Sequence, residues 1–438
     1  MSAVSLSAEG DAHDLVTGQS GRIVKAGALA SAVMMIIAAL LATASAGQTG
    51  LLANVLLFNR PPTNESLPLV GMLSLFNLAA FLIVLVGVRA REAWTLPLLP
   101  LLAAANLALL VFTGYAFGAI LAAIAAAASV SAWRSLRSYR MNPMALKELR
   151  GRMRGARAFI VLSVYLGLMS AFALLIYFAF NVGNRIGSSV GGEIGRTLFI
   201  ALVGIEMLLI LFIAPALTGG AITGERERQT YDLLRTTLLS PPAFVLGKLE
   251  SALAYLFLLL LAAIPLQSIA FLFGGVSEGE ILLAFVILGV TAVFLGALGI
   301  FFSAVMQRST TANVRAYLLM GIVMFVVPGI GALLLDALIN GLFASAAPVS
   351  SPLLETILVF VRFALNALNP VTTALTSQQV LIERQTIGFY PYTLSSTGGN
   401  IPLISPWALF AGIYLVASAV LILTAVRRAR RDDESSAV

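Results

Sequence analysis

The feature that most constrains this chain is a series of long apolar stretches, each about 20 residues, which is the length an α-helix needs to cross a bilayer. Hydrophobic residues make up 59% of the sequence, and the mean hydropathy is +0.97. Because unpaired peptide groups are costly in lipid, the stretches are predicted to be helices of an all-α polytopic membrane protein. The ten candidate spans are Ala26 to Ala46, Leu67 to Val88, Thr95 to Phe112, Tyr115 to Ala132, Ala158 to Phe180, Thr197 to Leu217, Ser251 to Leu272, Ile281 to Val305, Ala316 to Leu335 and Trp407 to Val426.

The placing of basic residues predicts the orientation of these spans. With both termini in the cytoplasm, only five of the 27 Lys and Arg residues are external, and the other 22 are cytoplasmic. Cytoplasmic loops are enriched in Lys and Arg, so we expect this threading in the cell membrane. The net charge of +7 then reflects topology, and no nucleic-acid partner is expected. The external arginines are Arg60, Arg185, Arg196, Arg362 and Arg384.

The segment between the fourth and fifth spans divides the chain. We expect a cytoplasmic tail at 1–25, a four-helix N-terminal membrane region at 26–132 and a cytoplasmic linker at 133–157. A six-helix core follows at 158–426, with an external segment at 336–406 and a basic then acidic cytoplasmic tail at 427–438.

Two parts of this plan have alternatives. Leu353 to Leu368 carries Glu355, Arg362 and Asn366 on one helical stripe, so it is predicted to lie at, or dip into, the outer membrane surface and not to cross it. The sequence ATASAG at Ala42 to Gly47 has the small residues of a signal-peptidase site. The long, partly acidic leading tail favours a retained first helix, and cleavage is the alternative.

A basic amphipathic helix is predicted within the linker. Asn142 can cap a helix that begins at Pro143, because an Asn side chain accepts a bond from a free backbone amide and Pro has none to satisfy. Lying on the cytoplasmic leaflet, this helix would bury its apolar face and hold anionic lipid with its basic face. An ordinary positive-inside loop is the alternative. The apolar positions are Leu146, Leu149 and Met153, and the basic positions are Lys147, Arg150, Arg152 and Arg154.

The stretch GAITGERERQTYDLLRTTLLSPPAFVLGK, at positions 220–248, is the most charged loop of the second half. Glu225 and Glu227 suit a helix N-terminus, and Pro241-Pro242 is expected to end the short helix that follows. Its exposed side chains are predicted to form a docking surface for another protein, with contact to lipid as the alternative. That surface comprises Arg226, an ion-pairing set of Arg228, Asp232 and Arg235, and an apolar stripe of Tyr231, Leu234 and Leu238.

Four motifs, in order, resemble the type-2 ABC exporter permease family: NPMALKELRGRMRGARAF, APALTGGAITGERERQTYDLLRTTLLSP, FLFGGVSEGE and GIFFSAVMQRSTTANVRAYL. The resemblance covers roughly Asn142 to Leu335. It implies a six-helix permease that pairs with a second copy or a homologous permease and sits on separate ATP-hydrolysing subunits. By this resemblance Asn142 to Arg157 is an elbow helix and Glu225 to Ser240 a coupling region. The four preceding spans and the long external segment depart from the family pattern.

ATP and Mg²⁺ are therefore expected on a partner subunit. A phosphate-binding P-loop needs Gly-x-x-x-x-Gly-Lys-Ser/Thr, but here Gly247-Lys248 is followed by Leu249, and Pro242 stands at the first Gly position. No catalytic, cofactor-binding or metal-binding residue is predicted on this chain.

Polar residues within the predicted spans have both structural and functional interpretations. Glu206 lies at mid-span depth, where it would contact a cationic substrate, act in a proton-linked switch, or fix helix packing. Gln267, Asn77 and Asn106 are expected to make interhelical hydrogen bonds. A secondary transporter driven through Glu206 is the first rival function. An intramembrane enzyme is a weaker one, since the chain has no Cys and its single His13 lies in the N-terminal tail.

Overall fold

The computed structural model describes residues 3–44, 66–113, 115–134, 139, 141–154, 156–183, 190–231, 240–343, 352–393 and 400–436. These residues are almost entirely α-helical. In chain order the elements are α1 (Ala3–Ala44), α3 (Ser66–Ala90), α4 (Thr95–Thr113), α5 (Phe117–Trp133), α6 (Pro143–Met153), α7 (Ala156–Gly183), α8 (Val190–Gly219), α9 (Thr223–Glu227), α11 (Pro241–Leu272), α12 (Glu278–Val305), α13 (Ser309–Gly321), the π-helical η2 (Ile322–Val326), α14 (Val327–Phe343), α15 (Pro352–Asn366), α16 (Pro370–Arg384), β1 (Phe389–Thr393), β2 (Asn400–Ile404) and α17 (Pro406–Ser436).

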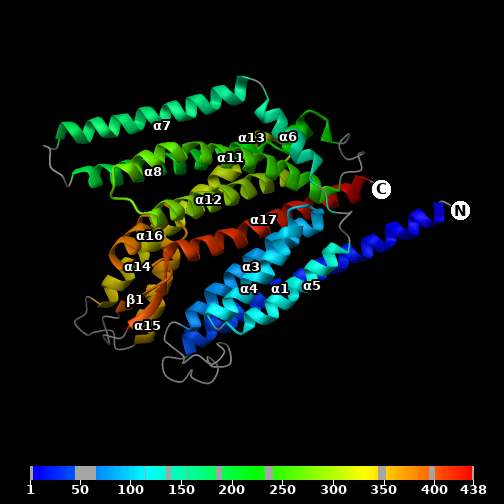
Figure 1. The fold of residues 1–438 in the computed structure, drawn as a ribbon, viewed down its shortest axis with the longest axis horizontal. Helices are drawn as coiled ribbons and strands as arrows, with labels where there is room; N and C mark the ends of the chain where they lie inside the picture. The colour runs from blue at the N-terminus through cyan, green and yellow to red at the C-terminus, as the bar shows by residue number, and fades with distance from the viewer. Residues whose placement is uncertain are drawn as a thin grey trace.

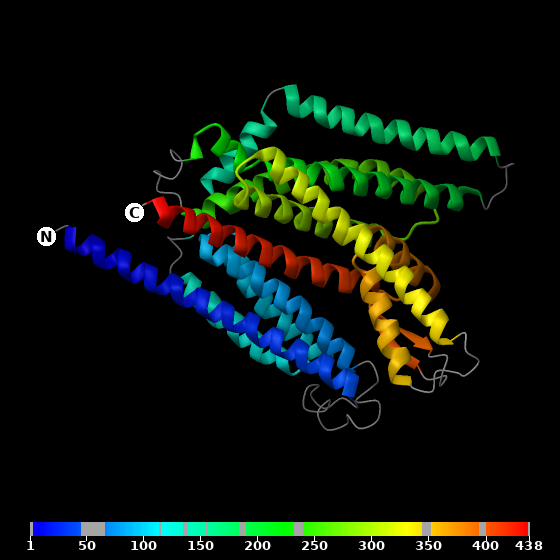
Figure 2. The same cartoon turned by 180° about the vertical axis from the view of Figure 1, so that it is seen from behind.

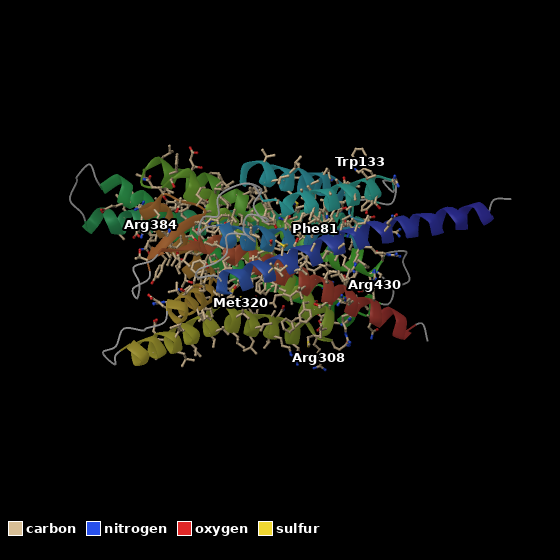
Figure 3. All side chains as sticks on the ribbon, turned by 90° about the horizontal axis from the view of Figure 1, so that it is seen from below. Phe81, Trp133, Arg308, Met320, Arg384 and Arg430 are labelled. Carbon is tan, nitrogen blue, oxygen red and sulfur yellow. The ribbon has the colours of Figure 1, made fainter. Side chains whose placement is uncertain are left out.

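The long helices run side by side along one axis of the molecule (Figure 1). Both chain termini and α6 lie at the same end, which is called the N/C end below. The opposite end, called the far end, carries α15, α16 and the two strands. Figure 3 shows Arg308 and Arg430 toward the N/C end and Arg384 toward the far end.

The helices form two packed groups (Figures 1 and 2). In the first, α1 packs on α3 and α5, and α4 packs on α5. In the second, α8 packs on α11 and α12, and α7 contacts α8 and α11. Helix α17 lies between the groups, against α12 on one side and α3 on the other. The last helix of the chain therefore joins the N-terminal region to the core.

Each of the ten predicted spans overlaps a helix, and the ninth, Ala316 to Leu335, runs through α13, η2 and α14. Eight helices among the described residues are long and apolar enough to cross a membrane, and α4 and α5 provide two shorter apolar helices. An all-α, multi-pass membrane protein is therefore confirmed, whereas ten crossings stay a prediction. Helix α1 begins at Ala3, so most of the predicted tail at 1–25 continues the first span as one helix. Of the cleavage-like motif, Ser45 to Gly47 lie outside the described residues.

Lipid contact explains the outward-facing side chains of two elements. On α7, Phe159 is 72% exposed, and on α14 Leu333 is also 72% exposed. A soluble protein would bury such residues, because apolar surface in water is unfavourable. In the hydrocarbon core of a bilayer, exposure of these apolar faces carries no such free-energy penalty. Their exposure therefore agrees with a membrane-embedded protein.

Helix α12 is the centre of the second group. Tyr414 of α17 packs against Phe294 of α12, with 4.4 Å between ring centroids, and against Phe410 one turn away at 4.2 Å. At its start, Ser277 and Glu280 exchange hydrogen bonds in a capping box. Just before it, Gly275 has φ +81, and a Cβ there would lie 2.0 Å from the carbonyl oxygen of Gly192. Only glycine fits this contact between the start of α8 and the α11–α12 turn.

Buried amides hold the N-terminal group together. Asn106 Nδ2 of α4 donates to Asn77 Oδ1 of α3 at 2.7 Å, as the sequence predicted. The hydroxyl groups of Ser74 and Tyr115 lie 2.9 Å apart. In the interior of this group, Phe81 is fully buried (Figure 3).

The far end contains more structure than the sequence predicted. The expected surface helix corresponds to α15, but α15 continues into α16 across a bend of 117°. Arg362 of α15 pairs with Asp336 of α14 at 3.4 Å. Gln378 of α16 donates to Glu280 of α12 at 2.7 Å, so α16 is tied to the core. Strands β1 and β2, which were not predicted, pair antiparallel with Phe389 opposite Ile404.

Candidate functional site

The charged stretch between α8 and α11 lies at the N/C end (Figure 1). It begins with the short helix α9, turns at Gln229, which has φ 56, and continues to Tyr231. We call residues 220–231 the coupling segment. Pro241 opens α11, where the first turn suits Pro, and the stretch that it was expected to end, 232–239, lies outside the described residues. Four predicted docking residues, Asp232, Leu234, Arg235 and Leu238, lie outside the described residues.

Arg226 attaches the coupling segment to the end of α12. Its Nη1 donates to the carbonyl oxygens of Ala304 at 3.2 Å and Met306 at 2.8 Å. The last carbonyls of a helix have no partner within the helix, and a cation stabilises their partial negative charge. The guanidinium also lies over the ring of Tyr231, 4.9 Å from its centroid. Arg226 is therefore a structural anchor of the segment.

Glu227 attaches the same segment to the start of α13. Its carboxylate accepts from the backbone N–H of Ser309 at 2.7 Å and from the Ser309 hydroxyl at 3.0 Å. The first amides of a helix lack internal partners and attract negative charge. Nearby, Ser303 Oγ accepts from the backbone N–H groups of Ile222 at 2.8 Å and Thr223 at 3.1 Å. The segment thus connects α12 and α13 on both sides of their turn.

Lys248 of α11 is the third anchor. Its side chain is buried, and its Nζ lies 2.6 Å from Glu148 of α6 and 2.8 Å from Glu225 of the coupling segment. Glu225 also accepts from the hydroxyl of Thr230. A buried ammonium is costly without anionic partners, and here two carboxylates supply the compensation. One lysine therefore joins the coupling segment, α11 and α6.

Tyr231 differs from its prediction as an exposed docking residue. Its side chain is only 8% exposed, and its ring meets Phe244 of α11 edge-on at 5.9 Å. Both residues belong to a cluster with residues from α3, α6, α12 and α17. The periodicity placed Tyr231 on an apolar stripe, but the ring of Tyr231 is covered by other side chains of this chain. The exposed part of the segment is instead its polar run, Glu227, Arg228, Gln229 and Thr230.

The predicted helix of the linker is present as α6. Asn142 caps it by accepting from the N–H of Met144 at 3.0 Å, and Pro143 is its first residue, as expected. Leu146 and Leu149 are half-buried, but Met153 is 45% exposed. Of the basic positions, Lys147, Arg150 and Arg154 are exposed and Arg152 is half-buried.

The anchor of α6 is a residue that the amphipathic pattern did not single out. Glu148 binds Lys248, and the Asn142 side chain also donates to the carbonyl oxygen of Ala243 at 2.6 Å. In the sequence, Lys248 stands out only as the lysine of an incomplete P-loop pattern. The available signal was a lysine two residues before Glu250, inside a run apolar enough to be buried.

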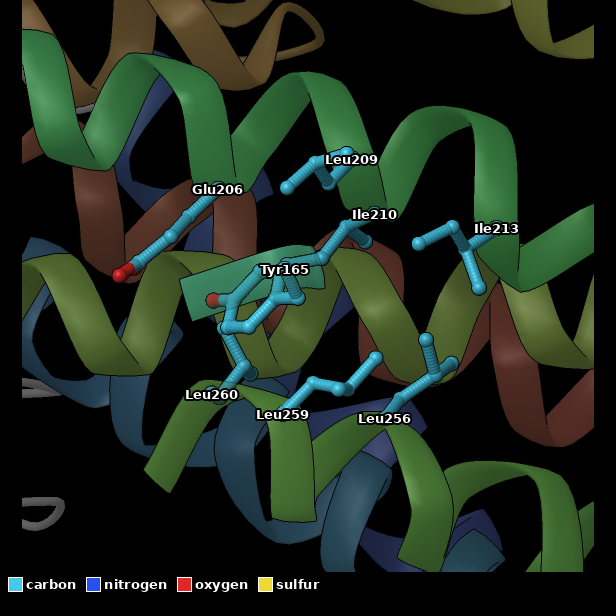
Figure 4. Close-up of a pocket in the computed structure, with 8 residues that line it drawn as sticks. All are labelled: Tyr165, Glu206, Leu209, Ile210, Ile213, Leu256, Leu259 and Leu260. Carbon is cyan, nitrogen blue, oxygen red and sulfur yellow. The ribbon is translucent and has the colours of Figure 1, made fainter. Parts of the chain in front are cut away.

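The two intramembrane polar residues are brought together between α8 and α11. Gln267 Nε2 donates to both carboxyl oxygens of Glu206, each at 2.8 Å, and both residues are 1% exposed. The interhelical bond expected of Gln267 is thus confirmed, with Glu206 as its partner. Glu206 also lines a cavity with Tyr165 of α7 and leucine and isoleucine side chains (Figure 4). Its volume of about 10 Å³ suits at most one water molecule.

No protein-family model matches the chain, and no curated protein matches it significantly. The features of this chain that bear on function are therefore the geometry of the coupling segment and of the Glu206–Gln267 pair.

Proposed function

We propose that this chain is the membrane-spanning subunit of an ABC exporter. In this proposal the chain pairs with a second copy or with a homologous permease. A separate subunit binds Mg²⁺ and ATP and hydrolyses the ATP. The chain itself performs no chemistry and opens and closes a path for substrate. The predicted threading places 22 of the 27 Lys and Arg residues, and both termini, in the cytoplasm. In this proposal the N/C end is therefore the cytoplasmic end.

The observation that carries the proposal is the triple anchoring of the coupling segment. Arg226 binds the end of α12, Glu227 binds the start of α13, and Glu225 binds Lys248 of α11. A force applied to the exposed face of this segment would reach three membrane helices through charged contacts. Rigid-body movement of packed helices is a common way to convert such a force into a change of access.

The same contacts extend to α6. Lys248 binds Glu148 as well as Glu225, so movement of the coupling segment is linked to the helix before the core. The exposed Lys147, Arg150 and Arg154 leave α6 able to hold anionic lipid headgroups. This supports a role for α6 as an elbow helix at the membrane surface.

The experiment is to purify the chain together with its ATP-hydrolysing partner and to measure binding, ATP turnover and substrate-stimulated turnover. Arg228→Glu reverses a charge on the exposed run and should reduce partner binding by about tenfold, as loss of a contact worth about 1.4 kcal/mol does. Arg134→Glu makes the same charge change at the exposed end of α5 and should leave binding unchanged. Equal binding by both variants, or a chain that transports without any ATPase, would contradict the proposal.

A second candidate is an ion-gradient-driven transporter that uses Glu206. The observation in its favour is the buried carboxyl of Glu206 paired with Gln267 inside the core. Buried ionisable groups in membrane helices are costly and are frequent in proton relays. Transport that follows a proton gradient, needs no ATP and is lost in Glu206→Gln would favour this candidate.

A further inference from the structure

A buried polar contact connects the N-terminal helix group to α6 and α11. In the turn between α3 and α4, Glu92 is 2% exposed, and its Oε1 accepts from Asn142 Nδ2 at 2.7 Å. Two residues later, Trp94 Nε1 donates to Glu250 Oε1 of α11 at 3.0 Å. The turn thereby contacts α6 and α11, the two helices that Lys248 joins to the coupling segment.

Asn142 is the centre of this contact. Its amide donates to Glu92 and to the carbonyl oxygen of Ala243, while its Oδ1 accepts from Met144. Three segments thus meet on one side chain. The approach is close, since a Cβ on Gly247 would lie 2.8 Å from Asn142 Oδ1. A small displacement of α6 from α11 would break several hydrogen bonds together.

The contact places two carboxyl groups in a poorly hydrated site. Burial raises the pKa of Glu92 from its ordinary value near 4.5 to about 7, and the nearby charge of Glu250 adds to this effect. The hydrogen bond from Asn142 opposes it only in part. A buried carboxyl beside a like charge commonly keeps a proton for these reasons.

We propose that the α3–α4 turn is a proton-controlled clamp, which holds α6 and the start of α11 while Glu92 is protonated and loosens when Glu92 ionises. The protonated carboxyl still offers an oxygen to Asn142, so the hydrogen bond survives. Ionisation instead leaves a buried negative charge facing Glu250. The clamp is a property of this chain alone and does not depend on an ATPase partner.

The direction of the pH dependence follows from linkage. When the clamp opens, Glu92 meets water and its pKa returns toward 4.5, so the closed clamp binds the proton more tightly. The clamp is therefore strongest below about pH 4.5 and weakens as pH rises through about 7. The charged groups on the elements around Glu92 include Arg89 and Arg91 on its own turn, Lys147 and Glu148 on α6, Lys248 and Glu250 on α11, and Arg427 and Arg430 on α17.

Hydrogen–deuterium exchange of the purified full chain tests the clamp. The amides of 142–153 and 240–250 are compared between wild type and Glu92→Gln at matched pH from 6 to 8, so that intrinsic exchange rates cancel. Gln keeps an acceptor for Asn142 but never ionises. The ratio of the wild-type exchange rate to that of Glu92→Gln should rise about tenfold between pH 6 and pH 8, because the stabilisation by the proton is lost as pH rises from about 4.5 to about 7. A wild-type to variant ratio that does not change with pH would overturn the proposal.

Two further variants keep the test decisive. Glu250→Gln preserves an acceptor for Trp94 and removes the like charge, so its pH-dependent loosening should be smaller than in wild type. If Glu92→Gln fails to fold, this comparison decides, and an unchanged pH dependence in Glu250→Gln would overturn the clamp. Glu278→Gln neutralises an exposed carboxylate at the far end and should match wild type at every pH.

Discussion

The ammonium group of Lys248 lies 2.6 Å from the carboxylate of Glu148, although 100 positions separate the two residues in the chain. The same ammonium lies 2.8 Å from Glu225. These contacts join α6, α11 and the coupling segment at one buried point. The arrangement explains how a charged residue can be retained at a buried position of a largely apolar helix.

Lys248→Met should destabilise the protein, because it leaves Glu148 and Glu225 close together without a cation. Removing one member of a buried ion pair costs about 3–5 kcal/mol. The two carboxylates here are 24% and 23% exposed, so water screens part of the repulsion. We expect the free energy of unfolding of Lys248→Met, measured in detergent, to be about 2–3 kcal/mol lower than that of wild type.

The matched control for this change is Lys147→Met, on the exposed side of α6, which should change stability by less than about 0.5 kcal/mol. Adding Glu148→Gln and Glu225→Gln to Lys248→Met should restore most of the loss. Wild-type stability of Lys248→Met would show that the cluster does not hold these segments together.

Tyr231→Ala should disrupt the packing of the coupling segment against α11. Truncating a buried aromatic residue costs about 3 kcal/mol, whereas Tyr231→Phe keeps the ring against Phe244 and should cost much less. Arg226→Ala should also weaken the attachment of this segment. Because Arg226 binds two carbonyl oxygens of α12, we expect it to cost about 1.5–3 kcal/mol.

Limited proteolysis at the N/C end and thermal unfolding measure these effects. Arg228→Ala serves as the control, since Arg228 is exposed on the same segment and its removal should leave the fold intact. A Tyr231→Ala protein with unchanged protease resistance would mean that the ring contributes little to packing.

The helices of this chain could be predicted from sequence because their determinants are local. Apolar length alone located the stretches that form the long apolar helices, and Asn142 followed by Pro143 located the start of α6. Polar residues in apolar helices must find partners, which is why bonds for Gln267, Asn77 and Asn106 could be expected in advance.

The partners themselves could not be predicted, because they depend on packing between distant segments. Nothing near Lys248 in sequence indicates Glu148, and nothing near Tyr231 indicates that α11 covers it. The bend between α15 and α16 is accompanied by contacts of α16 with α12 and α17, and strand β2 contacts α3. A single helical period does not encode such contacts.

The purified chain alone should hydrolyse no ATP. A P-loop lysine lies in a loop that follows a strand and opens a helix, where backbone amides surround the phosphates. Here Gly247 and Lys248 lie inside α11, and the ammonium is already bound by two carboxylates. ATP turnover, measured before and after adding a partner subunit, should appear only with the partner. Turnover that persists in a homogeneous preparation of the chain would contradict this.

Glu206→Gln should preserve folding and assembly. A glutamine can replace one hydrogen bond to Gln267 without placing a charge among apolar side chains, so the change should cost less than about 1 kcal/mol. Glu206→Leu instead leaves the Gln267 amide without its partner and should cost about 1–3 kcal/mol, because buried amides need hydrogen bonds. Stability and transport of both variants are compared across pH. If Glu206→Gln transports like wild type at each pH, the pair serves helix packing. If it loses a proton dependence that wild type shows, the ion-driven candidate gains over ATP-driven export.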